Sequence, residues 1–436
     1  MTSVASSNEL ISIAIIGAGI AGITLAIALS KHNPSLHLTI YESRPGFSEI
    51  GAGVGFGPNA IQAMTLISPD LTAAHNRVAT PNASPEKAHI WFDVRHGTGP
   101  HAGELIAEIE TKGGFVHCGA SRSQFLDEIV ALIPKSVKTE FRKKVVDVYE
   151  DEGSGKMKVK FHDGMEIEAD GVVGCDGIRS ACRKIMLGSG DESANAVYSG
   201  KYAYRKVVDM EKAVEVAGKL VENRQVYVGH GGHLLMFPIR GGKGLNIVAF
   251  VDAKGKPWID RQWVVPASRE DVLQDYKGWG KIPTALLELI DEPDKWALFD
   301  HLPAPTYVKG NFCLIGDAAH ATTPHSGSGA GFAVEDAQLL SGLLTLEFIK
   351  SRRDIGYAFK AYDAIRRPRS QKLVTNSRQN GRTLELQDDD GELLDYERLA
   401  GRMEENMEWA WEVDLGAMLD EAKKLVKNYE SINGVP

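Results

Sequence analysis

The sequence has little of several features that would point to other classes of protein. Only four of its 436 residues are cysteine, and no two of them form a CxxC pair, so we expect a reducing compartment and no disulfide framework. The formal net charge of −9 argues against nucleic acid as a partner. We predict no metal ligands, and no internal repeat is evident. What remains is the composition of a soluble intracellular enzyme.

The N-terminal part also lacks positive charge. Residues 11–29 form a run with almost no polar side chain, which could be taken for a signal peptide or a membrane span. However, no lysine or arginine precedes Lys31, and three glycines at nucleotide-binding spacing lie inside the run. We therefore predict no signal peptide and no membrane span. Because the C-terminus carries no peroxisomal signal either, we expect a cytoplasmic protein.

The apolar run is better explained as the start of a dinucleotide-binding unit. The segment Ile11–Ile16 is typical of a buried parallel strand, and it ends directly in a Gly-x-Gly-x-x-Gly motif. The first glycine permits a tight turn, the second leaves room for a pyrophosphate, and the third lets the next helix pack closely. Glu42 ends the second strand, where a carboxylate can bind a ribose. The predicted cofactor contacts here are Gly17, Gly19, Ile20, Ala21, Gly22, Glu42 and Arg44.

A second glycine–carboxylate corner follows some 300 residues later. The apolar segment Phe312–Ile315 ends in Gly316-Asp317-Ala318-Ala319-His320. Either corner alone would be weak evidence. In this order and at this separation, they predict a long dinucleotide, most simply FAD, lying across one large domain.

A glycine-rich stretch lies between the two corners. Residues 51–57 contain four glycines and precede Pro58, which is favoured in the first turn of a helix. Such a stretch predicts backbone pressed against a flat ligand or, alternatively, a mobile loop. We include Gly53 and Val54 among the predicted cofactor contacts.

The pattern along the chain predicts an interleaved α/β organisation. We assign residues 1–78, 115–195 and 300–384 to a discontinuous, Rossmann-like FAD-binding domain. Residues 79–114 and 196–299 form a predicted α+β substrate domain, because strands such as Gln225–Val228 and Leu245–Val251 indicate an antiparallel sheet. Residues 385–436 form a predicted C-terminal helical segment. Its amphipathic stretch 414–427 could dock on the body or on a second subunit, so a homodimer remains open.

The motifs together resemble those of the class A flavoprotein aromatic monooxygenases, in the salicylate hydroxylase-like branch. The first corner resembles the family's ADP-binding fingerprint, and Gly316-Asp317 followed by Pro324 resembles its GD motif. The stretch Asp176-Gly177-Ile178-Arg179-Ser180-Ala181-Cys182-Arg183 resembles its DG motif. The likeness covers roughly residues 10–380, in the correct order.

The resemblance implies further cofactor contacts. Asp317 would hold ribityl hydroxyls, and Arg122 would sit by the pyrophosphate or the ribityl chain, although Phe125 replaces the usual leucine of that motif. The helix beginning near residue 332 would face the flavin pyrimidine edge, and this branch commonly has glycine where the chain has Gly331. The implied contacts are Arg122, Asp176, Gly177, Gly316, Asp317, Pro324, Gly327, Gly329, Ala330 and Gly331.

The resemblance also implies a reaction. NADH or NADPH reduces FAD, O₂ is captured as a C4a-hydroperoxide, and an electron-rich phenol attacks the distal oxygen. We expect a small aromatic substrate, with salicylate-type phenols leading, and salicylate itself would lose CO₂ and become a catechol. One alternative is dearomatising hydroxylation of a polyketide-derived phenol. A flavin reductase or redox sensor that inserts no oxygen is a third interpretation.

The resemblance also gives candidate substrate contacts. Arg205, which could pair with a carboxylate or phenolate, His233 and Pro324 are the predicted catalytic residues. One face of the strand 233–238 carries His233, Leu235 and Phe237, and alternation alone does not decide which face lines the pocket. The predicted substrate contacts are Tyr204, Arg205, His233, Leu235, Phe237, Asn246 and His325. Trp409-Ala410-Trp411 partly matches a halogenase signature, but it lacks the following Ile-Pro, and we treat it as coincidental.

Overall fold

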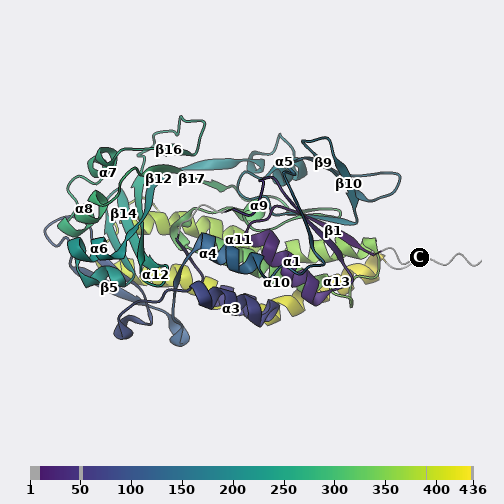
Figure 1. Cartoon of the computed structure of the whole chain (residues 1–436), viewed down its shortest axis with the longest axis horizontal. Coiled ribbons are helices and arrows are strands. Elements are labelled where there is room, and N and C mark those ends of the chain that lie inside the picture. Colours follow the sequence, from purple (N-terminus) through teal and green to yellow (C-terminus); the bar gives the residue numbers. More distant parts are fainter. Residues whose placement is uncertain (1–9, 49–52, 389, 434–436) are drawn as a thin grey trace, which may run out of the picture.

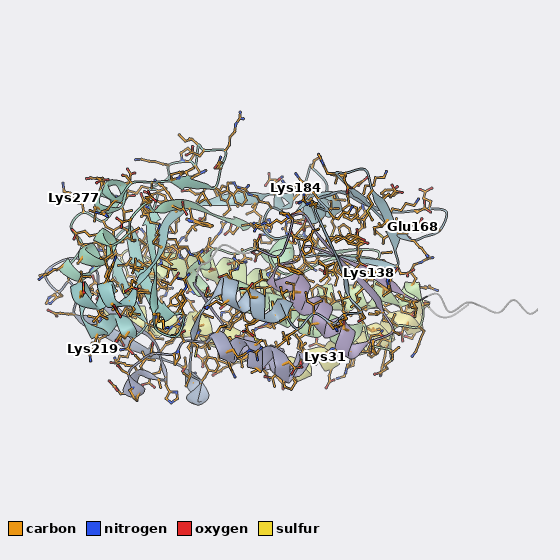
Figure 2. The ribbon with its side chains drawn as sticks, viewed as in Figure 1. Lys31, Lys138, Glu168, Lys184, Lys219 and Lys277 are labelled. Carbon is orange, nitrogen blue, oxygen red and sulfur yellow. The ribbon has the colours of Figure 1, made fainter. Side chains whose placement is uncertain are left out.

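The computed structural model describes residues 10–48, 53–388 and 390–433. The first two residues of the glycine-rich stretch, Gly51 and Ala52, lie outside the described residues, as do residues 1–9 and 434–436 of the first and last predicted segments. The molecule is elongated, with one large sheet near each end and helices running between them (Figure 1). In Figure 2, the labelled Lys219 and Lys277 mark one end, and Lys31, Lys138 and Lys184 lie toward the other.

One end of the molecule carries the glycine motifs that are predicted to bind FAD, and we call it the FAD end. It is built on a six-stranded sheet in the order β18-β19-β11-β1-β2-β7. All neighbouring strands are parallel except β18 and β19. Parallel strands buried on both faces need near-continuous apolar sequence, which the first strand supplies. The strands are β1 (Ser12–Ile16), β2 (His37–Glu42), β7 (Lys138–Phe141), β11 (Gly171–Gly174), β18 (Val308–Lys309) and β19 (Phe312–Leu314).

Helices and a small antiparallel sheet surround this sheet. The predicted meander is a three-stranded sheet of β8 (Val145–Glu150), β9 (Met157–Phe161) and β10 (Glu166–Ala169), and β3 (Gly53–Gly55) pairs with β6 (Gly119–Ser121). The helices of this end are α1 (Ile20–His32), α2 (Pro58–Ile67), α3 (Pro69–Val78), α4 (Arg122–Val130), α5 (Ala181–Leu187), α9 (Asp317–His320) and α10 (Gly329–Leu343). Short 3₁₀ turns include η3 (Glu192–Ala194) and η5 (Pro324–Ser326).

The other end contains the strands of the predicted substrate domain, and we call it the substrate end. It is built on an eight-stranded sheet in the order β16-β17-β12-β15-β14-β13-β4-β5. Its strands are β4 (Ile90–His96), β5 (Leu105–Glu110), β12 (Ala196–Asp209), β13 (Gln225–Gly229), β14 (Gly232–Ile239), β15 (Gly244–Asp252), β16 (Val264–Pro266) and β17 (Asp294–His301). One face is covered by α6 (Met210–Ala217), α7 (Arg269–Asp275) and α8 (Lys281–Glu288). Segments 90–110 and 196–301 therefore share one sheet, although 85 residues separate them in the chain.

Three C-terminal helices tie the ends together. Helix α11 (Arg352–Leu384) has 33 residues, and at 1.5 Å per residue it spans about 50 Å. It is followed by α12 (Tyr396–Trp411), near the substrate end, and α13 (Leu415–Asn433), near the FAD end (Figure 1). Leu415, Ala422 and Val426 of α13 are buried in the main core, so this helix docks on the body. No helix in the described part of the chain is long and apolar enough to cross a membrane. The predicted homodimer remains a prediction.

Candidate active site

One cavity of about 350 Å³ is lined by residues from both ends of the molecule. Its wall includes these predicted site residues: Gly19, Ile20, Ala21, Gly53, Val54, Arg122, Gly177, Arg205, Leu235, Phe237, Asn246, Asp317, Pro324, His325, Gly327, Gly329 and Ala330. The other predicted residues lie behind the wall or away from it: Gly17, Gly22, Glu42, Arg44, Asp176, Tyr204, His233, Gly316 and Gly331. Segments that are distant in the sequence thus meet around one space.

The first glycine motif has the shape of a phosphate cradle. A Cβ on Gly22 would come within 2.0 Å of the carbonyl oxygen of Gly17, and a Cβ on Gly17 would lie 2.5 Å from that of Cys175. A Cβ on Gly19 would meet nothing within 4 Å, so this residue borders open space. Helix α1 begins there without a side-chain cap or an acidic residue in its first turn. Its free N–H groups and positive end therefore fit an anionic pyrophosphate.

Glu42 stands beside this motif, at the end of β2. Its Oε2 accepts a hydrogen bond from the backbone N of Ala18 at 2.8 Å, and its Oε1 accepts one from the N of Arg44 at 2.8 Å. The carboxylate is thereby fixed against the glycine turn, where a ribose can reach its remaining lone pairs. The Arg44 side chain is exposed, and its Nη1 donates to Ser48.

The second corner presents a helix start and a carboxylate to the same cavity. Asp317 is half-buried in the wall, and a Cβ on Gly329 would lie 3.9 Å from its Oδ1. Helix α10 begins at Gly329 without a side-chain cap and without an acid in its first turn. Gly316 has φ +58°, and a Cβ there would lie 2.9 Å from the Cβ of Ala21, so glycine allows α1 and α10 to approach. Gly331 faces Ala60 of α2 and has a packing role.

The DG motif is held together by its own polar side chains. Asp176 accepts hydrogen bonds from Ser180 Oγ and from the backbone N of Ala181 and Cys182, at 2.5, 2.7 and 3.0 Å. Its carboxylate therefore caps α5. Fully buried Arg183 donates to Ser193 O at 2.6 Å and also to carbonyl oxygens of α9. This arginine thus joins the DG motif to the GD corner.

The GD corner rests on a buried ionic network. Asp336 of α10 accepts hydrogen bonds from the backbone N of Gly316 (2.9 Å) and from Arg366 Nε (2.8 Å), and its Oδ2 lies 2.6 Å from His320 Nε2. Burial acts to raise the pKa of Asp336, but His320 and Arg366 outweigh burial and hold the pKa below its usual value. His320 is therefore a structural residue, and the network positions the first turn of α10.

The register of the substrate sheet decides which side chains face the cavity. Directly opposite residues share a face, and Arg205, Val248, Leu235 and Val226 form one row across β12, β15, β14 and β13. A neighbouring row pairs His233 with Phe250. The face that carries His233, Leu235 and Phe237 is therefore turned toward the cavity.

Tyr204 is a correction to the sequence prediction. It belongs to the opposite row, packs in the core beneath α6–α8, and its hydroxyl donates to Asp275 Oδ2 at 2.7 Å. Because successive strand residues point to opposite faces, Arg205 and Tyr204 cannot both line the cavity. The structure places Arg205 there and removes Tyr204 from the wall.

Arg205 and Asn246 hold the backbone of β3 against the sheet. Arg205 Nη2 donates to Gly53 O at 3.1 Å, and Asn246 Oδ1 accepts from Gly53 N at 3.0 Å. A Cβ on Gly53 would lie 2.4 Å from the Phe237 ring, so only glycine allows this approach. The glycine-rich stretch is therefore pressed against the substrate sheet in its described part.

A cluster of buried titratable groups lies at the His325 side of the cavity. The ring of His325 lies 4.8 Å from Phe250 and 5.2 Å from His233, measured between centroids, and His233 stacks on Phe250 at 4.3 Å. Burial lowers the pKa of His325 to about 3 and, reinforced by His325, holds the pKa of His233 well below its usual value. Both imidazoles are therefore neutral near pH 7. His233 Nδ1 lies 3.9 Å from Oε1 of Glu385.

Sequence reasoning missed the far end of the cavity. Arg224 is 3 % exposed, its guanidinium lies between the rings of Phe92 (4.6 Å) and Phe237 (4.9 Å), and its Nη1 has no hydrogen-bond partner among the described residues. Burial lowers its pKa to about 9, so it stays charged at pH 7. Helix α12 adds Met403, Met407 and Trp411 to the wall. No local motif in the sequence signals these residues, and only the aromatic content of 409–411 could have prompted attention.

Comparisons with known proteins agree with this geometry. Residues 131–377 match the FAD binding domain family, and residues 15–49 match the NAD(P)-binding Rossmann-like domain family. The chain is 40% identical over 412 residues to 6-methylsalicylate 1-monooxygenase of Aspergillus terreus, covering 93% of this chain and 90% of that protein. It is 37% identical to a salicylate hydroxylase of Pseudomonas putida, over 97% of this chain and 96% of that one.

A solved structure of a salicylate hydroxylase substrate complex superposes with a TM-score of 0.83 and 32% identity, covering 94% of this chain and 98% of that one. The predicted fold class, an interleaved Rossmann-like domain with an antiparallel substrate sheet and C-terminal helices, is confirmed. The chain belongs to the salicylate hydroxylase-like family of FAD-dependent monooxygenases.

Proposed function

We propose that this protein hydroxylates a phenolic aromatic acid of the salicylate type, using NAD(P)H and O₂ with bound FAD. The observation that carries the proposal is that a single cavity joins the dinucleotide cradle to an aromatic sheet face and to the neutral, buried imidazole of His325 in η5. The relatives named as acting on salicylate and 6-methylsalicylate support the substrate class.

The residues that would hold FAD are those of the two corners. Gly19 and the start of α1 would take the pyrophosphate, Glu42 and Asp317 would bind sugar and ribityl hydroxyls, and the start of α10 would face the flavin ring. When bound, FAD would supply the acceptance of hydride from NAD(P)H and the activation of O₂.

The protein's own tasks are to orient the phenol, exclude water and accept a proton. Leu235, Val248 and Phe250 provide apolar walls that exclude water. The uncharged imidazole of His325 lines the cavity and offers a lone pair to the phenolic proton. Because burial makes this imidazole a weak base, it releases its other ring proton as it accepts one, which leaves an electron-rich phenolate. Arg205 fixes β3 and adds positive charge to the wall, and Arg224 adds a second buried charge that favours an acidic substrate.

For salicylate the reaction balances as a decarboxylating hydroxylation. Salicylate, NADH, O₂ and two protons give catechol, CO₂, NAD⁺ and water.

We also propose a cytoplasmic location, supported by the absence of a CxxC pair among the four cysteines.

The test is anaerobic reduction of the holoenzyme by NADH or NADPH, with and without candidate phenols, followed by admission of O₂. Reduction that a phenol accelerates, followed by an oxygenated product, is expected. Reduction indifferent to every phenol, with peroxide alone as product, would identify a non-oxygenating flavin reductase. Product mass separates the alternatives, because catechol formation loses CO₂, whereas dearomatising hydroxylation of a polyketide-derived phenol keeps every carbon.

A further inference from the structure

The buried cluster beside His325 contains more unsatisfied polar atoms than a structural core tolerates. Both ring nitrogens of His325, both of His233 and Oε1 of Glu385 are buried without a hydrogen-bond partner among the described residues. Buried polar groups are almost always paired, and each unpaired one costs free energy. Five such atoms in contiguous side chains therefore need an explanation beyond packing.

The scaffold around the cluster holds it rigidly. The Tyr276 hydroxyl lies 2.8 Å from the carbonyl oxygens of both His233 and Phe250, which fixes the backbone of the two opposite residues. On α11, a Cβ at Gly381 would lie 2.7 Å from the His325 ring, so glycine is required for the helix to pass the imidazole. Glu385 lies four residues later, at the end of the same helix. Residues four apart share a helix face. The last turn of α11 therefore leaves space for the His325 ring at Gly381 and places the Glu385 carboxyl near His233.

The chain of groups leads from the cavity toward the surface. His325 lines the cavity, His233 lies 5.2 Å behind it between ring centroids, and Glu385 follows at 3.9 Å from His233 Nδ1. The other oxygen of Glu385 pairs with Lys201 Nζ, whose side chain is 12% exposed whereas that of Glu385 is 0% exposed. The groups thus pass in sequence from a substrate contact to a side chain that reaches solvent.

We propose that His325, His233, Glu385 and Lys201 form a proton-transfer path that carries the phenolic proton out of the cavity. The inference rests on the proposed phenol hydroxylation. The O–H bond of the phenol breaks and its proton binds one nitrogen of His325, which releases the proton on its other nitrogen to His233. His233 passes it to the Glu385 carboxylate. The Lys201 ammonium, which has no free lone pair, first gives one of its own protons to water and then takes up the proton of Glu385. The net change is one phenolate in the cavity and one proton in solvent.

The charges facing Glu385 make it a suitable acceptor. Burial raises its pKa to about 7, with Asp252 acting in the same direction, while Lys201 and Arg382 oppose the rise. Two further groups face the Glu385 carboxyl: His233, from the sheet, and Tyr276, from the segment after α7. A carboxyl that titrates near neutrality can take up and release a proton at ordinary pH.

The variants that test the path are Glu385→Gln and His233→Phe, with Glu405→Gln, at an exposed position of α12, as the carboxyl control. Glu385→Gln keeps the shape of the side chain but cannot accept a proton. In single-turnover hydroxylation of salicylate by the reduced holoenzyme, we expect each path variant to lower the rate about 10–100-fold, with FAD content and salicylate affinity retained. The wild-type rate should rise with pH through about 7, and this rise should vanish in Glu385→Gln. Because the groups act in series, the double variant should be no slower than the slower single variant.

A second readout does not depend on turnover. Infrared spectra of the oxidised holoenzyme should show the carbonyl band of a protonated buried carboxyl that disappears as pH rises through about 7, and Glu385→Gln should lack this band. An unchanged pH profile in Glu385→Gln, or additive losses in the double variant, would overturn the path. If wild type turns over no phenol, the proposed function fails first, and the infrared band still reports whether Glu385 holds a proton.

Discussion

The two ends of the cavity are built in different ways. At the FAD end, the pyrophosphate cradle is made of backbone atoms, and glycines such as Gly17, Gly19 and Gly22 make room for it. At the substrate end, side chains from β12–β15, η5 and two helices converge, and their backbones lie far apart in the sequence. The pyrophosphate cradle lies within six consecutive residues, whereas the substrate end draws on residues spread over some 200. A substitution in the cradle should therefore disturb the whole phosphate site, whereas a substitution at the substrate end should change one contact and leave the others in place.

The largest effect should come from closing the backbone cradle. Gly22→Ala places a Cβ within 2.0 Å of the Gly17 carbonyl, so α1 must move away from β1. We expect loss of about 1–3 kcal/mol or more of folding stability and a purified protein without flavin absorbance. Gly19→Ala tests FAD binding without disturbing the packing, because its Cβ meets no protein atom within 4 Å. It should lower FAD affinity and leave the thermal stability of the apoprotein unchanged, and equal melting losses in both variants would contradict the distinction.

At the substrate end, changes should spare the cofactor. His325→Gln removes the neutral base from the cavity and should lower kcat about 100-fold, with FAD retained and its absorbance spectrum intact. Steady-state turnover with salicylate measures the effect. His101→Gln, at an exposed histidine outside the cavity wall, serves as the control. Loss of FAD from the His325 variant would show that His325 also contributes to FAD binding, so that the two ends do not act independently.

Arg205 lies where the two ends meet, so its replacement should give an intermediate result. Arg205→Ala removes the bond to Gly53 O, which positions β3. We expect kcat/KM for phenols to fall about 10–100-fold while FAD remains bound. Arg205→Lys should recover part of the loss, because lysine keeps the positive charge but lacks the planar guanidinium group and its fixed hydrogen-bond directions. Unchanged kinetics in the alanine variant would remove Arg205 from the site.

These contrasts show how much of the molecule could be read from the sequence. The glycine corners were predictable because strand, turn and helix follow one another, and each glycine has a steric reason within its own segment. Tyr204 was misplaced because both faces of the substrate sheet are apolar, so alternation separates the faces without saying which one is covered by helices. Arg224 was missed because burial of one arginine depends on Phe92 and Phe237, which lie 145 residues apart.

Replacing a side chain of α12 that lines the cavity should have a smaller effect, confined to substrate binding. Trp411→Ala removes an indole that lines the cavity and packs edge-on against Trp91 at 5.0 Å. KM for the aromatic substrate should rise several-fold with kcat little changed, because substrate and transition state lose the same contact. Trp409→Ala is the matched control, since Trp409 packs on Phe332 away from the cavity. Equal KM changes in both variants would show that α12 acts only by packing.

The smallest effect concerns stability and pH. Burial raises the pKa of Glu385 from 4.5 to about 7 in the folded protein. Between these values the folded state binds more protons than the unfolded state, so the stability this group supplies is complete below pH 4.5 and is lost as pH rises through about 7. Glu385→Gln should remove this dependence, worth at most about 3 kcal/mol, in urea unfolding at pH 5 and 8. A variant that stays as pH-dependent as wild type would contradict the assignment.

The placement of Trp411 in the cavity also bears on how the enzyme is made. Translation releases α12 after the whole FAD-end sheet, because α10 ends at Leu343 and α12 ends at Trp411. At ribosomal speeds of about 5–20 residues per second, those 68 residues take roughly 3–14 s. During that interval α11 is also made, and it brings Arg366, whose ion pairs with Glu335 and Asp336 position α10 at the cofactor corner. A chain that stops after α11 would therefore keep this ion-pair network but lack the side of the cavity that Met403, Met407 and Trp411 form, and we expect such a product to spend reductant on peroxide.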